Sequence, residues 1–239
     1  MSDSAVLVVG AGESTGGAIA KRFAREGYVA CLARRNGDQL APLVVEIEKE
    51  GGRAVPFGCD ARDEDQVIAM FETIERDVGP LEVVVFNPGG NVNFPIRDTT
   101  ARVYRKVWEM ACFGGFLTGR EAARVMVPRG QGTILFTGAT ASVRGGAGFS
   151  AFAGAKHALR ALAQSMAREL GPEGIHVAHV VIDGAIDTPW IRETFPQIAK
   201  SGKAMLAPDE IAETYWQLHR QPRSVWSFEL DIRPFDEKF

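Results

Sequence analysis

A glycine-rich segment near the amino end carries the clearest chemical signal in the chain. Directly after a short apolar run, three glycines and two hydroxyl residues precede a helical pattern: Gly10, Gly12, Ser14, Thr15 and Gly16. Glycines let a backbone turn approach a phosphate closely, and the amino end of the following helix stabilises the phosphate charge. A plain tight turn has a similar composition. The position of this one, between the first strand and first helix of a βα series, favours a dinucleotide site.

Two arginines follow the second apolar run, at a position that selects between the two nicotinamide dinucleotides. Ala33 stands where NAD-binding folds place a carboxylate for the ribose 2′-hydroxyl, and Arg34 and Arg35 come next. A guanidinium binds a 2′-phosphate with two parallel hydrogen bonds. We therefore predict NADP(H), with NAD(H) the weaker ligand. The alternative interpretation is that Arg34 and Arg35 are a solvated pair at a helix entrance. Glu13 in the glycine turn argues against NADP(H), because its carboxylate would repel the 2′-phosphate.

Neither a metal site nor a disulfide framework is expected. Cys31, Cys59 and Cys112 are odd in number, widely spaced and surrounded by apolar residues, which predicts buried core thiols in a reducing compartment. No paired CxxC, HExxH or close cluster of His with carboxylates occurs, so the metal prediction is none.

The elements that must position these groups alternate along the whole chain. Apolar runs predict seven strands: Ala5–Val9, Tyr28–Ala33, Ala54–Phe57, Glu82–Phe86, Thr133–Thr137, Ile175–Ile182 and Val225–Ile232. Most are continuously apolar, as buried parallel strands are, whereas the last alternates polar and apolar residues like an edge strand. Helical spacing between the runs predicts a single Rossmann-type, doubly wound parallel sheet with helices on both faces.

No repeat or linker divides residues 1–239, and we predict one NAD(P)-binding domain. Residues 189–207 follow the sixth strand without a clear periodicity, and we predict a substrate lid there. The net charge of -3 offers no basic field for nucleic acid, and no apolar run is long enough to span a membrane. A soluble cytoplasmic protein is therefore the expectation.

From the glycine turn onward the chain resembles the short-chain dehydrogenase/reductase family. The stretch VGAGESTGGAIA at 9–20 is similar to the family fingerprint TGxxxGxG, with Val9 at the Thr and Ser14 at the middle Gly. Asp60 resembles the Asp that contacts the adenine, and residues 86–89 resemble the NNAG segment. Residues 182–188 look like the PG…T segment around the nicotinamide, with Asp183 in place of Pro. The resemblance extends strongly to about Thr188.

This resemblance implies a cofactor site that draws on every βα junction. Its residues are Gly10, Gly12, Ser14, Thr15, Gly16, Arg34, Arg35, Asp60, Ala61, Asn87, Gly89, Lys156, Gly184, Ile186 and Thr188. It also implies a homodimer or homotetramer, built on helices at 102–125 and 151–170. Small residues in the first of these helices, Ala111, Gly114, Gly115 and Thr118, are expected to permit close helix approach across the interface.

The family's catalytic residues are largely replaced. In the family a Tyr moves the substrate proton, a Lys one helical turn later lowers the Tyr pKa, a Ser orients the carbonyl and an Asn completes a relay. Lys156 matches the Lys, but Phe152 stands at the Tyr, Ala139 at the Ser and Ala111 at the Asn. The catalytic centre implied by the resemblance therefore consists of Lys156 and Phe152.

Four other groups lie near these positions in the sequence. Thr140 and Ser142 are the nearest hydroxyls, and we name Thr140 as the candidate that orients a substrate oxygen. Asp183 is a candidate substitute base at a strand end. His157 follows Lys156, but its place in the helix directs it away from the Phe152–Lys156 face.

Two functions remain open at this stage. The cofactor residues favour an NADP(H)-dependent oxidoreductase acting on a small carbonyl or alcohol substrate of unknown identity, with a degenerate catalytic centre. The lost catalytic residues favour a catalytically inactive NADP(H)-binding regulatory or sensing protein. A third interpretation, a subunit that mainly assembles with a partner, draws on Trp190, Trp216 and Trp226, although aromatic residues at such spacing are more often core.

Overall fold

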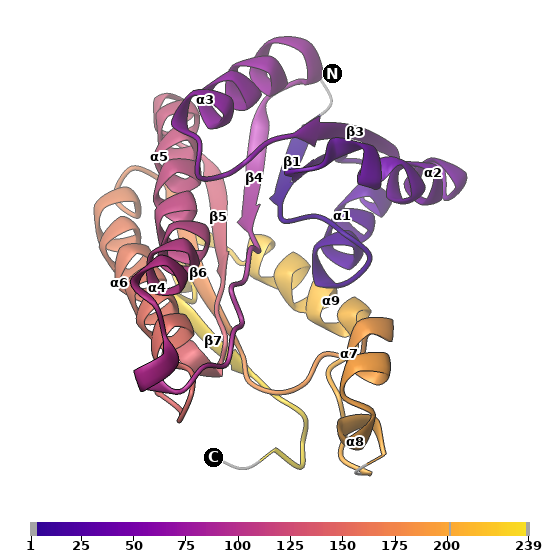
Figure 1. The fold of residues 1–239 in the computed structure, drawn as a ribbon. Coiled ribbons are helices and arrows are strands. Elements are labelled where there is room, and N and C mark those ends of the chain that lie inside the picture. The colour runs from indigo at the N-terminus through magenta and orange to yellow at the C-terminus, as the bar shows by residue number, and fades with distance from the viewer. Residues whose placement is uncertain (1–3, 201, 238–239) are drawn as a thin grey trace.

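The computed structural model describes residues 4–200 and 202–237. Within them, seven parallel strands form one sheet in the order β3-β2-β1-β4-β5-β6-β7 (Figure 1). The strands are β1 Ala5–Val9, β2 Val29–Arg34, β3 Arg53–Gly58, β4 Leu81–Phe86, β5 Gly132–Thr137, β6 Ile175–Ile182 and β7 Glu229–Ile232. The prediction of a doubly wound parallel sheet is confirmed, and β7 is an edge strand as expected.

Helices cover both faces of the sheet (Figure 1). One face carries α1 Thr15–Arg25, α2 Ala41–Lys49 and α9 Pro208–His219, and the other carries α3 Glu64–Thr73, α4 Ala101–Trp108, α5 Gly114–Met126 and α6 Ser150–Leu170. Two short helices, α7 Pro189–Thr194 and α8 Pro196–Ala199, extend beyond the carboxyl ends of the strands. Strands buried on both faces must be apolar throughout, which explains the continuous runs seen in the sequence.

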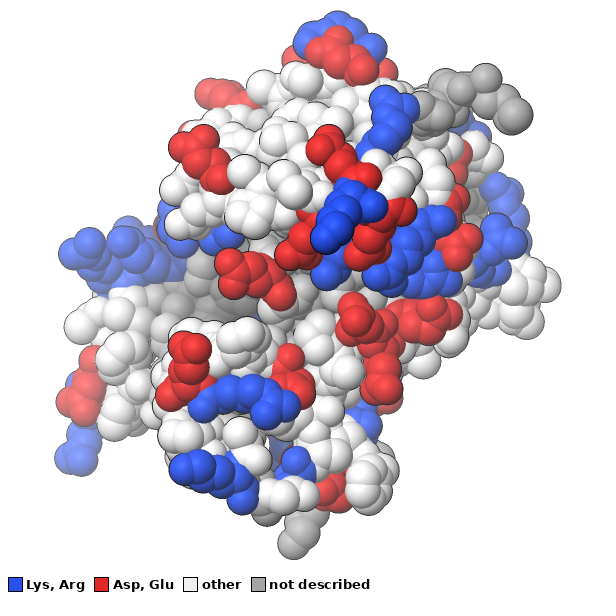
Figure 2. Space-filling view, turned by 90° about the vertical axis from the view of Figure 1, so that its right-hand side faces the viewer, with Lys and Arg blue, Asp and Glu red and all other residues white. Residues whose placement is uncertain are grey.

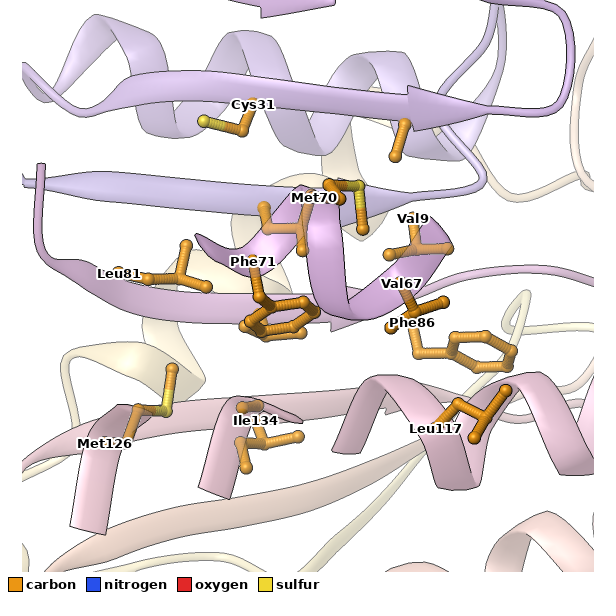
Figure 3. Close-up of a cluster of buried hydrophobic side chains, with 14 of the residues drawn as sticks. Val9, Cys31, Val67, Met70, Phe71, Leu81, Phe86, Leu117, Met126 and Ile134 are labelled. Atoms are coloured by element: carbon orange, nitrogen blue, oxygen red, sulfur yellow. The ribbon is translucent and has the colours of Figure 1, made fainter. Parts of the chain in front are cut away.

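The core on the α3, α5 and α6 side is a continuous apolar layer. Phe71 of α3, Phe86 of β4 and Leu117 of α5 point into it with Ile134 of β5, and each is at most 2% exposed (Figure 3). Cys31 lies in the same layer, and all three cysteines are free and buried. Burial raises the pKa of the Cys31 thiol to about 12. The prediction that the cysteines are core thiols is confirmed.

Two expected elements have different bounds. The last strand begins at Glu229 rather than Val225, because Arg223–Val225 forms a turn of 3₁₀ helix before it. The helix expected at 102–125 is interrupted by a π turn at Glu109–Phe113. A π turn inserts one extra residue per turn, which hydrophobic periodicity alone does not reveal.

The small residues of α5 do not form an exposed interface, which corrects that expectation. Gly114 lies against the Ala61 carbonyl, and Gly115 packs on Leu159 and Phe86 within the same chain. Ala111, in the π turn before α5, and Thr118 are also fully buried. These residues let α5 approach the chain's own sheet and helix α6, so their interface role was wrong.

Acidic and basic side chains are interspersed on the face that carries α1, α2 and α9 (Figure 2). A surface of mixed charge creates no long-range field of one sign. In the part of the chain that the structure describes, no helix combines the length and the apolar character needed to cross a bilayer.

Candidate functional site

A cavity of about 850 Å³ opens at the carboxyl ends of β1, β4, β5 and β6. The strand order reverses between β1 and β4, and loops diverge from such a switch point to leave a crevice where α/β proteins bind ligands. The predicted residues that line the cavity are Gly10, Gly12, Ser14, Thr15, Gly16, Asn87, Gly89, Thr140, Phe152, Lys156, Gly184, Ile186 and Thr188. The tertiary structure thus gathers segments that are up to 178 positions apart, from 10 to 188, at one place.

The glycine turn is held close against the start of α1. Gly10 has a φ of +85°, a conformation that favours glycine. A Cβ on Gly17 would collide with the carbonyl oxygen of Gly12, so the helix can follow the turn this tightly only without a side chain there. Asn87 Nδ2 donates a hydrogen bond of 3.2 Å to the Gly10 carbonyl and joins the turn to the end of β4. The turn therefore fits a pyrophosphate at the amino end of α1.

Arg34 and Asp60 lie beside this cavity rather than in it. A Cβ on Gly12 would be 3.9 Å from Arg34 Nη1, so the half-buried guanidinium lies next to the glycine turn, whereas Arg35 is exposed. Asp60 accepts two hydrogen bonds from the Arg62 guanidinium, of 2.9 and 2.6 Å, and these hold the pKa of its carboxyl below the usual range. Asp60 lines a second pocket of about 650 Å³, and Ala61 borders Gly114 of α5. A ligand that extended from the cavity to these predicted cofactor residues would have to cross the end of β2. The residues are Arg34, Arg35, Asp60 and Ala61.

Lys156 occupies the floor of the cavity on α6. Only 2% of its surface is exposed, and Nζ donates to the Thr137 carbonyl at 2.8 Å and to the Pro88 carbonyl at 3.1 Å. Burial lowers its pKa from 10.5 to about 8. One N–H remains for a ligand, so Lys156 can hold a ribose hydroxyl.

Phe152 lines the cavity one turn before Lys156, and no tyrosine from elsewhere in the chain lines it. The side chain packs with Phe149 and Ala139 in a small apolar cluster. The three tyrosines of the chain lie elsewhere: Tyr28 beside Glu82, Tyr104 against Gly154, and Tyr215 bonded to the Thr137 hydroxyl. Because none of them lines the cavity, no phenol is available to a bound substrate.

Thr140, which lines the cavity, forms a hydrogen-bonded pair with Asp183, which is buried and does not line it. Thr140 Oγ1 donates to Asp183 Oδ1 in a short hydrogen bond. Arg233, from beyond β7, also approaches Asp183, with Nη2 at 3.2 Å from Oδ2. Arg144 Nη2 is 3.8 Å from Oδ1, outside hydrogen-bond distance. Asp183 is therefore partnered on both oxygens, which leaves little freedom for a role as a base.

Two other predicted neighbours lie off the site. Ser142 is fully buried, and its hydroxyl accepts the Ala139 amide at 3.1 Å, so it stabilises the loop after β5. His157 is exposed and its Nδ1 contacts the Ala153 carbonyl at 2.9 Å. It does not line the cavity, in agreement with the expected direction of its side chain.

The segment after β6 contributes aromatic and aliphatic side chains to the cavity. Trp190 and Ile191 of α7, with Phe195 and Ile198, line one side of it. Thr188 caps the amino end of α7, since its Oγ1 accepts the Ile191 amide at 3.1 Å. Residue 201 of the predicted lid at 189–207 lies outside the described residues.

Sequence reasoning missed several lining residues. Arg144, Asn91 and Phe149 line the cavity, and Arg233 reaches Asp183 from the far end of the chain. Arg144 lies four residues after Thr140, so its proximity could have been suspected, but no sequence signal places Arg233.

The parallel sheet, the switch-point cavity and the glycine turn define a nucleotide-binding α/β protein of the Rossmann type. A profile of the family described as short chain dehydrogenase matches residues 4–199. The chain belongs to this family of NAD(P)-dependent oxidoreductases.

Solved structures and curated proteins agree with this assignment. A short-chain dehydrogenase from Rhodopseudomonas palustris is 54% identical, with a TM-score of 0.85, and the match covers 97% of this chain and 99% of that one. An alcohol dehydrogenase from Thermococcus sibiricus, solved with 5-hydroxy-NADP, is 25% identical with a TM-score of 0.85, and 99% of each chain is covered. Zerumbone synthase from Zingiber zerumbet is 32% identical over 79% of this chain and 72% of its own.

Proposed function

We propose that the protein is an NADP(H)-dependent oxidoreductase that acts slowly on a small carbonyl or alcohol substrate. The observation that carries this proposal is the cavity in which the glycine turn and Lys156 face the same space. A nicotinamide dinucleotide bound there supplies hydride chemistry. Gly10, Gly12 and Ser14 would hold its pyrophosphate, and Gly184 would border the nicotinamide.

The other predicted residues would hold the remaining parts of the dinucleotide. Arg34 and Arg35 would hold the 2′-phosphate, Asp60 and Ala61 the adenine, and the others would hold the central part and the nicotinamide end: Thr15, Gly16, Asn87, Gly89, Lys156, Ile186 and Thr188. The alcohol dehydrogenase from Thermococcus sibiricus, solved with 5-hydroxy-NADP, supports an NADP-type ligand.

Slow turnover follows from the missing proton donor. A positioned general acid or base contributes about 10²–10⁴ in rate. Phe152 has no proton to transfer, and the Thr140 proton is already donated to Asp183. Titration with NADPH and NADH, followed by assays with ketones and aldehydes, tests cofactor binding and turnover separately.

The missing proton donor also supports a second candidate function, an inactive NADP(H)-binding regulatory or sensing protein. In that case NADPH binds, no carbonyl or alcohol is converted, and Lys156→Ala changes only cofactor affinity. Turnover that is lost in Lys156→Ala favours the enzyme instead.

Cofactor preference gives a direct prediction. Arg34→Ala is expected to weaken NADPH binding about tenfold and to leave NADH binding almost unchanged, because only NADPH carries the 2′-phosphate. Calorimetric titration of the wild type and Arg34→Ala with NADPH and NADH measures the four affinities. Arg76→Ala, a distant and exposed arginine, is the matched control. Equal affinities for the two cofactors in the wild type would contradict the prediction.

We also propose a homodimer or homotetramer. Tyr104 and Trp108 of α4 and Phe116 of α5 are 40–45% exposed, and the rings of Trp108 and Phe116 both stack with Phe113. An exposed aromatic patch of this kind is typical of an interface. Light scattering at micromolar concentration is expected to give a multiple of 25.9 kDa, and a monomer would contradict it.

A further inference from the structure

We infer that Arg144 selects an anionic substrate, a carbonyl compound that carries a carboxylate next to an apolar or aromatic body. The inference rests on the proposed oxidoreductase function and specifies its substrate class. It follows from which donors at the mouth of the cavity remain unused.

Thr140 cannot serve as a donor to a substrate oxygen in this arrangement. Its only hydroxyl proton points to Asp183 Oδ1, so its oxygen can accept a hydrogen bond but has no proton left to donate. Phe152 and Ala139 have no polar hydrogen at all. The positions that usually bind the substrate oxygen therefore offer no hydrogen-bond donor in this chain.

Arg144 is the charged donor that remains. It lines the cavity, 55% of its side chain is exposed, and its nearest carboxylate oxygen, on Asp183, is 3.8 Å away. No described residue forms a hydrogen bond with its guanidinium. Asp183 itself is held by Thr140 and by Arg233 at 3.2 Å, so it neutralises Arg144 only in part.

The other charged residues that line the cavity do not compete for this role. Lys156 is buried and already bonded to two carbonyl groups. Glu13 is a carboxylate on the glycine turn and would repel an anion. An anionic group is therefore best placed beside Arg144, where a guanidinium can bind a carboxylate through two parallel hydrogen bonds.

The remaining surface of the cavity indicates the rest of the ligand. Phe149 and Phe152 form one apolar cluster, and Trp190 and Phe195 of the α7 region contact each other edge to face at 5.4 Å. All four aromatic residues line the cavity together with Arg144. An aryl or bulky aliphatic oxo acid matches this combination of one cation and an aromatic wall.

The test compares benzoylformate and its longer homologue benzoylpropionate with their uncharged methyl esters. Calorimetric titrations in saturating NADP⁺ measure binding without turnover. The wild type is expected to bind at least one acid about tenfold more tightly than its ester. Arg144→Gln is expected to abolish this preference while NADP⁺ affinity is retained, Arg144→Lys is expected to keep part of it, and the control Arg76→Gln is expected to keep all of it.

Each outcome is decisive. Equal binding of acids and esters, binding of neither, or a preference that survives Arg144→Gln would overturn the inference. A parallel loss of NADP⁺ affinity in Arg144→Gln would assign the residue to the cofactor instead. If the wild type does not bind NADP⁺, the oxidoreductase proposal fails, and titration of the free protein with the acids still tests Arg144.

Discussion

Phe152→Tyr is expected to raise the rate of ketone reduction with NADPH about a hundredfold, the lower end of the range for general acid catalysis. The change adds a hydroxyl to a ring that already lines the cavity one helical turn before Lys156. The lysine ammonium favours the charged form of a nearby phenol and so lowers its pKa. Steady-state kinetics of both variants with NADPH and a panel of ketones measures the effect.

A second substitution separates proton transfer from substrate orientation. Phe152→Tyr combined with Ala139→Ser is expected to exceed the single variant, because the added hydroxyl orients the carbonyl. Ala139→Ser alone, without a proton donor, is the matched control and is expected to change little. Fast reduction by the wild type that Phe152→Tyr does not alter would show that Thr140 or Asp183 already moves the proton.

Lys156→Met is expected to make the stability of the cofactor-free protein less dependent on pH above neutral pH and to weaken NADP(H) binding about tenfold or more. Burial lowers the pKa of Lys156 from 10.5 to about 8, so the charged form is disfavoured in the folded state. This difference costs about 3 kcal/mol of stability below pH 8. The two hydrogen bonds that the ammonium group donates to carbonyls stabilise the folded state by about 1.5–3 kcal/mol each, so they offset this cost at neutral pH.

The lowered pKa of Lys156 fixes the sign of the pH dependence. A folded pKa below the unfolded pKa means that the unfolded chain binds more protons, so wild-type stability recovers as pH rises through about 8 toward 10. The stability of the Met variant relative to the wild type is therefore expected to fall by about 1 kcal/mol between pH 7 and pH 9. Urea unfolding of both variants at the two pH values measures it. A difference in stability between the two variants that does not change between pH 7 and pH 9 would contradict the prediction.

Local sequence determined most of the fold and the class of ligand. Strands such as Ala5–Val9 and Ile175–Ile182 are apolar throughout because both of their faces are buried, and helices recur at the spacing that covers such a sheet. The glycine turn required no tertiary information, since a close helix after a strand needs glycine at fixed positions. The bounds of β7 and the π turn at Glu109–Phe113 escaped prediction because neither changes the hydrophobic pattern enough.

Only the tertiary structure decided which side chains meet. The sequence showed that Phe152 lacks a hydroxyl, but the folded chain showed that no other tyrosine lines the cavity and that Thr140 has already donated its proton to Asp183. The small residues of α5 were assigned to an interface and pack instead inside the chain, because spacing does not say which neighbour a helix face meets. Arg233 reaches Asp183 across 50 positions of sequence, a contact that exists because β6 and β7 are adjacent in the sheet.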